Sequence, residues 1–166
     1  MRKQGLDLLR GISVLLVLFR HSEIDCLLNR IGWAGVDVFF VLSGFLVSGL
    51  IFREYRKKES VNVGRFLIRR GFKIYPPFYL MILLTLLIQL FLKKGFSPVS
   101  EILSEVFYMQ AYFKSIWHHT WSLSVEEHFY LLIALFAYIG SRTKKLGEKN
   151  FNLTVIIVLL AVNFIL

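Results

Sequence analysis

The feature that most constrains this chain is a series of long apolar runs separated by basic segments. A helix needs roughly 20 mainly apolar residues to cross a bilayer. The mean hydropathy of +0.61 and the formal charge of +9 are typical of membrane spans joined by basic loops, and unlike a soluble domain. We therefore expect an all-α, polytopic integral membrane protein with about five transmembrane helices, at residues 6–28, 35–52, 75–92, 121–140 and 151–166.

Polar side chains interrupt the first of these runs in a regular way. On an α-helix, Arg10 and His21 fall within roughly 20° of the same face and about 16 Å apart along the axis. Asp7 joins this stripe one turn before Arg10. Ionisable groups inside a span cost on the order of 2.5–3.5 kcal/mol each, so they usually face protein or a water-filled cavity. The stripe predicts a polar seam for chemistry or transport. Because Asp7 and Arg10 break the apolar region, we expect a retained span and not a secretory signal.

Basic residues predict the orientation of the spans. With the amino terminus in the cytoplasm, 14 Lys and Arg residues fall on the cytoplasmic side, five fall outside, and Arg10 lies within a span, which accounts for all 20. We therefore expect a multi-pass protein of the cell (inner or plasma) membrane with a cytoplasmic amino terminus. Residues 65–73 mix basic and apolar residues as an interfacial helix does, and Pro76 and Pro77 mark the entry to the third span. Residues 96–119 should lie along a membrane surface.

Several classes of site are disfavoured. The basic residues form no patch apart from the apolar runs, so nucleic acid is not an expected partner. Cys26 is the only cysteine, which excludes an intramolecular disulfide and a cysteine cluster for zinc. His118 and His119 lack a third ligand at a convincing spacing, so we assign no metal.

Four stretches resemble motifs of acyltransferase family 3, integral-membrane proteins that O-acylate cell-envelope polysaccharides and related acceptors. They are LDLLRG at 6–11 with His21, GVDVFFVLSGFL at 35–46, RRGFKIYP at 69–76 and WSLSVEEHFY at 121–130. Their order is that of the family. Lys73 stands where the third motif usually has a second arginine, and lysine lacks the planar fork that binds phosphate bidentately. Family members look about twice as long, with around ten spans, so residues 1–166 should form a partial membrane acyltransferase domain corresponding to the amino-terminal half.

The resemblance implies a membrane O-acyltransferase that moves an acyl group, with acetyl expected, from a cytoplasmic acyl-CoA donor to a hydroxyl of an envelope carbohydrate. His21 would act as the base, because an imidazole of near-neutral pKa suits proton transfer from a hydroxyl, and Arg10 would support it. Direct transfer and a covalent acyl-histidine stage both stay open. Cations at Arg69, Arg70 and Lys73 would bind the phosphates of the donor. The donor is a substrate, and no bound cofactor is expected.

Four further residues would support the substrate or the structure: Asp7, Asp37, Ser43 and Glu126. Asp7 would orient Arg10, and Asp37 is the one charge in the second span. Ser43 does not lie in a nucleophile elbow, so helix packing is the favoured role there, as it is for Gly44 and Ser48, four residues apart. A functional role for Glu126 comes from the resemblance only, since an acid near a helix start also suits the helix dipole.

Plainer alternatives remain for these residues and for the whole chain. His21 could be an interfacial histidine, Arg10 a snorkelling side chain, and the basic motif a topology determinant attracted to anionic lipid. The chain itself could be a truncated, non-catalytic membrane fragment, or a partner subunit whose missing helices another chain supplies. A transporter that uses the same seam is a further alternative, which would bind solute without consuming acyl donor.

Overall fold

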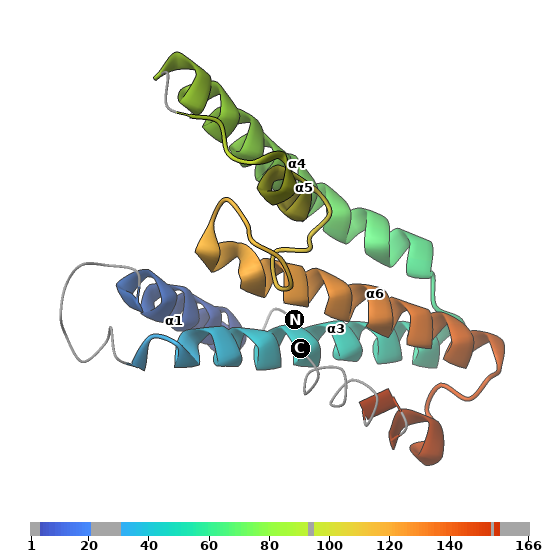
Figure 1. The fold of residues 1–166 in the computed structure, drawn as a ribbon. Coiled ribbons are helices and arrows are strands. Elements are labelled where there is room, and N and C mark those ends of the chain that lie inside the picture. The colour runs from blue at the N-terminus through green and yellow to red at the C-terminus, as the bar shows by residue number, and fades with distance from the viewer. Residues whose placement is uncertain (1–3, 21–30, 93–94, 154, 157–166) are drawn as a thin grey trace. The chain divides into compact units, whose positions relative to one another are not determined.

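The computed structural model describes residues 4–20, 31–92, 95–153 and 155–156 (Figure 1). Within these ranges the chain is helical and contains no strand, which confirms the all-α prediction. The chain divides into two compact units, Met1–Arg53 and Glu54–Leu166. Its labelled elements are α1 (Gln4–Arg20), α3 (Ala34–Lys58), α4 (Val63–Phe91), α5 (Val99–Val106), the 3₁₀ helix η1 (His118–Thr120) and α6 (Trp121–Arg142).

Three helical stretches in the described part of the chain are long and apolar enough to cross a membrane. They are α3, α4 and the stretch His118–Arg142 that joins η1 to α6. The predicted spans at 35–52, 75–92 and 121–140 correspond to these three. The predicted first and fifth spans, 6–28 and 151–166, extend into residues outside the described ranges, so the expected number of five is untested.

Glycine allows α1 and the start of α3 to approach closely within the first unit. A Cβ added at Gly35 would lie 2.7 Å from the carbonyl oxygen of Ser13 and 2.9 Å from Cβ of Leu16. These distances are shorter than real carbon contacts, so a larger residue at position 35 would push the helices apart. Small residues at such contacts are typical of helices that pack within a membrane. Ser13 is buried and donates its hydroxyl to the carbonyl oxygen of Leu9 (2.8 Å), so its polar group is satisfied within α1.

The second unit corrects the predicted break before the third span. The interfacial helix at 65–73 and the span at 75–92 form one continuous helix, α4, with Pro76 and Pro77 inside it. Proline has no N–H, so the carbonyls one turn earlier lose their helical donors. The helix nevertheless continues because two residues just before the prolines, Arg70 and Tyr75, form polar contacts with α6, as described below. Its amino terminus is capped by Asn62, whose side-chain oxygen accepts a hydrogen bond from the N–H of Arg65 (2.9 Å).

The segment predicted at residues 96–119 forms specific contacts with α4 and α6. The ring of Tyr108 is buried against Phe78 and Ile82 of α4. Tyr79 of α4 donates its hydroxyl to the carbonyl oxygen of Val106 (3.0 Å), at the end of α5. Ser124 of α6 donates its hydroxyl to the carbonyl oxygen of Tyr108. The segment therefore ties α4 to α6, while Phe107 and Phe113 stay exposed.

Candidate functional site

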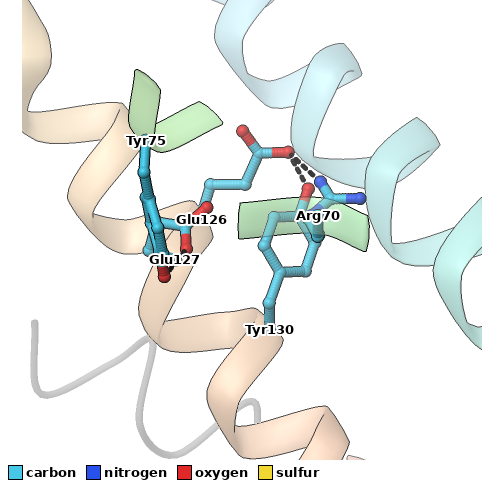
Figure 2. Close-up of polar contacts among 5 residues, drawn as sticks. All are labelled: Arg70, Tyr75, Glu126, Glu127 and Tyr130. Atoms are coloured by element: carbon cyan, nitrogen blue, oxygen red, sulfur yellow. Dashed lines mark hydrogen bonds and ion pairs between the residues drawn. The ribbon is translucent and has the colours of Figure 1, made fainter. Parts of the chain in front are cut away.

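A cluster of five polar residues joins α4 to α6 within the second unit (Figure 2). Helix α4 contributes Arg70 and Tyr75, and α6 contributes Glu126, Glu127 and Tyr130. The three side chains from α6 are 1–8% exposed. Burying charge in this way is costly unless the charges are paired and hydrogen-bonded. Glu126 is paired with Arg70, whereas Oε1 of Glu127 is buried with no hydrogen-bond partner among the described residues.

Arg70, Glu126 and Tyr130 meet at a single carboxylate oxygen. The Nη2 atom of Arg70 donates a hydrogen bond to Oε1 of Glu126 at 3.0 Å. The hydroxyl of Tyr130 donates to the same oxygen, and Figure 2 shows the two bonds converging on it. Glu126 and Tyr130 are four residues apart on α6, so they lie on the same helix face. The guanidinium carbon of Arg70 also lies 3.1 Å from the centre of the Tyr130 ring, a cation–π contact.

Tyr75 and Glu127 form a second link between the same helices. The hydroxyl of Tyr75 donates a hydrogen bond to Oε2 of Glu127 at 3.1 Å. The two adjacent carboxylates of α6 thus each have a partner on α4: Glu126 has a cation, and Glu127 has a neutral donor. The chain places them side by side, and without such partners their like charges would repel in a buried setting.

An aromatic group lies next to this second link. The ring centre of Tyr108 is 5.5 Å from that of Tyr75 and 4.9 Å from that of Phe78. Burial raises the pKa of the Tyr108 hydroxyl, which has no hydrogen-bond partner among the described residues. These rings pack between α4 and the segment that follows α5, while Tyr75 itself is 36% exposed.

Glu105 of α5 contacts the residues that immediately precede α6. Its side chain is fully buried and accepts hydrogen bonds from the hydroxyl of Thr120 (3.0 Å) and the backbone N–H of Trp117 (3.2 Å). Burial raises the pKa of the Glu105 carboxyl, and these hydrogen bonds oppose the rise. The carboxylate therefore joins the end of α5 to η1, six residues before Glu126.

A surface cavity of about 430 Å³ lies at the amino-terminal end of α4. Its lining includes two cations, Lys58 and Arg65, and one carboxylate, Glu54. Arg65 is followed at four-residue intervals by Arg69 and Lys73, and all three are exposed. Residues four apart share a helix face, so a basic stripe leads from the cavity along α4.

The structure places the other predicted site residues in different settings. In the first unit Arg10 is half-buried, and its Nε atom is buried with no hydrogen-bond partner among the described residues. Asp7 and Asp37 are exposed, and Ser43 is buried. His21, the predicted base, lies outside the described residues.

One predicted separation is wrong. The sequence placed Arg70 on the cytoplasmic side and Glu126 at the outer end of the fourth span, yet the two side chains are in contact. The reason is the continuity of α4: Arg70 is the eighth residue of a 29-residue helix and does not belong to a separate interfacial segment. Arg70 and Glu126 therefore lie at the same depth.

Sequence reasoning missed three of the five residues of the cluster. Tyr75 belongs to the quoted motif at 69–76, and Glu127 and Tyr130 belong to the motif at 121–130, but none of them received a role. The four-residue spacing of Glu126 and Tyr130 was a usable signal, because an acid and a tyrosine on one face of an apolar helix need a common partner.

Comparison with known proteins gives the family. A family model described as an acyltransferase domain, Acyl_transf_3, matches residues 3–166. The chain belongs to acyltransferase family 3. The predicted resemblance is confirmed.

Two relatives illustrate how much of a family protein is present. YrhL of Bacillus subtilis is 32% identical over 152 residues, which covers 82% of this chain and 24% of YrhL. The peptidoglycan O-acetyltransferase OatA of Listeria monocytogenes is 30% identical over 157 residues, which covers 81% of this chain and 24% of OatA. The chain thus spans about a quarter of the length of the curated relatives it matches. No solved structure matches it.

Proposed function

We propose that this acyltransferase family 3 chain takes part in O-acylation of an envelope carbohydrate, with an acyl-CoA, in the first instance acetyl-CoA, as donor. The observation that carries the proposal is the meeting of two family-like motifs, 69–76 and 121–130, in one buried cluster through Arg70 and Glu126. The name of OatA makes peptidoglycan the first acceptor to test. The reaction moves an acyl group from sulfur to oxygen and needs no external oxidant or reductant.

The proposed chemistry uses His21 as the base. The imidazole takes the proton of the acceptor hydroxyl, the oxygen attacks the thioester carbonyl carbon, the carbon–sulfur bond breaks, and the thiolate of coenzyme A leaves and is protonated. With a covalent acyl-histidine, the imidazole would first take the acyl group from the sulfur of coenzyme A and then pass it to the acceptor oxygen. The overall bonds broken and formed would be the same. Arg10, oriented by Asp7, would support the site from the same helix.

The donor phosphates would bind along α4. Arg69 and Lys73 are exposed cations on one helix face, and the cavity beside Lys58 and Arg65 has the volume typical of small-ligand sites. Arg70 forms an ion pair with Glu126, so it would bind the donor while it remains paired. This placement fits a cytoplasmic donor if the amino terminus is cytoplasmic and the protein lies in the cell membrane. Helices beyond the described spans would complete the enclosure, either from the same protein or from a partner chain.

Acetyl transfer in membrane vesicles tests the proposal. Full-length protein in sealed vesicles should transfer label from acetyl-CoA to a peptidoglycan acceptor, and Arg69→Ala and Lys73→Ala should each raise the donor KM more than the acceptor KM. Lys73→Arg should be tolerated or improve donor use, because it restores the planar fork. Lys145→Ala, an exposed cation beyond α6, is the matched control. A transport protein or a non-catalytic subunit would transfer no label.

A further inference from the structure

We infer that Tyr130 is a positioning residue that orients the Arg70 guanidinium for the acyl donor. The inference rests on the proposed function, and it adds a residue and a reason to it. Tyr130 is the largest fully buried side chain in the described part of the molecule, at 1% exposure. Tyr130 lies in the interior of α6 and not at a helix end, so its position relative to α4 and α6 is fixed.

Two parts of the Tyr130 side chain act on Arg70 in different ways. The ring lies under the guanidinium, with the guanidinium carbon 3.1 Å from the ring centre. The hydroxyl donates to Oε1 of Glu126, the same oxygen that accepts from Nη2 of Arg70. The ring thus sets the plane of the guanidinium, and the hydroxyl holds the carboxylate that sets its rotation (Figure 2).

This arrangement reduces the number of orientations available to a long side chain. An arginine loses considerable rotamer freedom when it binds a ligand. A guanidinium already held by a ring and a carboxylate loses less, because part of its ordering is complete before the donor arrives. The ring therefore acts on donor affinity, which is why its contribution should appear in KM.

The same helix contains a matched control. Phe136 lies six residues beyond Tyr130, and its aromatic side chain is half-buried. It does not line the cavity at the start of α4 that is proposed to bind the donor. Substitution of Phe136 removes an aromatic ring from α6 without removing the ring that contacts Arg70.

The test measures donor KM and acceptor KM in the full-length protein with acetyl-CoA. Tyr130→Leu removes the ring and should raise the donor KM by about tenfold, with the acceptor KM unchanged and kcat much less affected. Tyr130→Phe keeps the ring and should restore most of the donor affinity. Phe136→Leu should change neither constant.

A fluorinated phenylalanine series at position 130 covers the case in which Tyr130→Leu fails to fold. Fluorine weakens the cation–π attraction while preserving the shape of the ring, so the donor KM should rise with each added fluorine at position 130. The same series at position 136 should have no effect. If the donor KM does not change with the number of fluorines at position 130, the inference is overturned but the proposed function is not. Absence of acetyl transfer by the unsubstituted protein overturns the proposed function, and this inference with it.

Discussion

At the scale of single residues, the environment of Arg70 differs from that of an exposed cation that could bind a phosphate group. Its guanidinium is paired with Glu126 and stacked on Tyr130. Loss of donor binding after removal of Arg70 would therefore combine two causes: a missing phosphate partner and an uncompensated carboxylate. The exposed cations Arg69 and Lys73 separate these causes, because their removal leaves the pair intact.

Arg70→Ala should lower the free energy of unfolding by about 3–5 kcal/mol, because it leaves the buried carboxylate of Glu126 without its cation. The double variant Arg70→Ala/Glu126→Gln should recover part of this loss, since the amide carries no charge. Thermal unfolding in detergent, followed by circular dichroism, measures both. Equal stability of the single variant and the wild type would show that the pair contributes nothing to the fold.

At the scale of elements, Glu105 connects α5 to η1 through the hydroxyl of Thr120 and the N–H of Trp117. Burial raises the pKa of this carboxyl in the folded protein above its ordinary value. The folded state then binds a proton more tightly than the unfolded state. Its contribution to stability is fully present below the unfolded pKa and is lost as pH rises through the folded pKa.

Glu105→Gln should therefore flatten the fall in melting temperature between mildly acidic and neutral pH, and should leave the protein at least as stable as the wild type at neutral pH. The amide oxygen can accept the same two hydrogen bonds. Glu105→Ala should be less stable at every pH, because it leaves the Trp117 N–H without its acceptor. The Thr120 hydroxyl keeps its bond to the carbonyl oxygen of Trp117. Parallel pH profiles for the wild type and Glu105→Gln would contradict the assignment.

The sequence predicted the helices better than it predicted their contacts. The apolar runs were sufficient for α3 and α6, because hydropathy and length determine a span. The start of α4 was predicted wrongly, because Pro76 and Pro77 normally end a helix, and the contacts of Arg70 and Tyr75 with α6 that sustain it come from residues more than 50 positions away. For the same reason Arg70 and Glu126 were each identified as candidates but not as a pair.

At the scale of the whole molecule, the distribution of basic residues predicts the orientation of the spans in the membrane. Reporter fusions after Lys58 and Arg142 should give cytoplasmic signals, and fusions after Asn29 and Lys114 should give external signals. A cytoplasmic signal at Lys114 would refute the orientation, because it would require an even number of crossings between Arg2 and that site.

The central claim is that the chain belongs to a membrane enzyme whose acyl transfer depends on His21. Acetyl transfer from acetyl-CoA by the full-length protein, compared between the wild type and His21→Gln at equal membrane level, tests this most directly. General-base catalysis is worth about 10²–10⁴-fold in rate. Glutamine preserves size and hydrogen bonding but cannot take a proton at neutral pH, so the account predicts a loss of that order. Full activity of His21→Gln would contradict it.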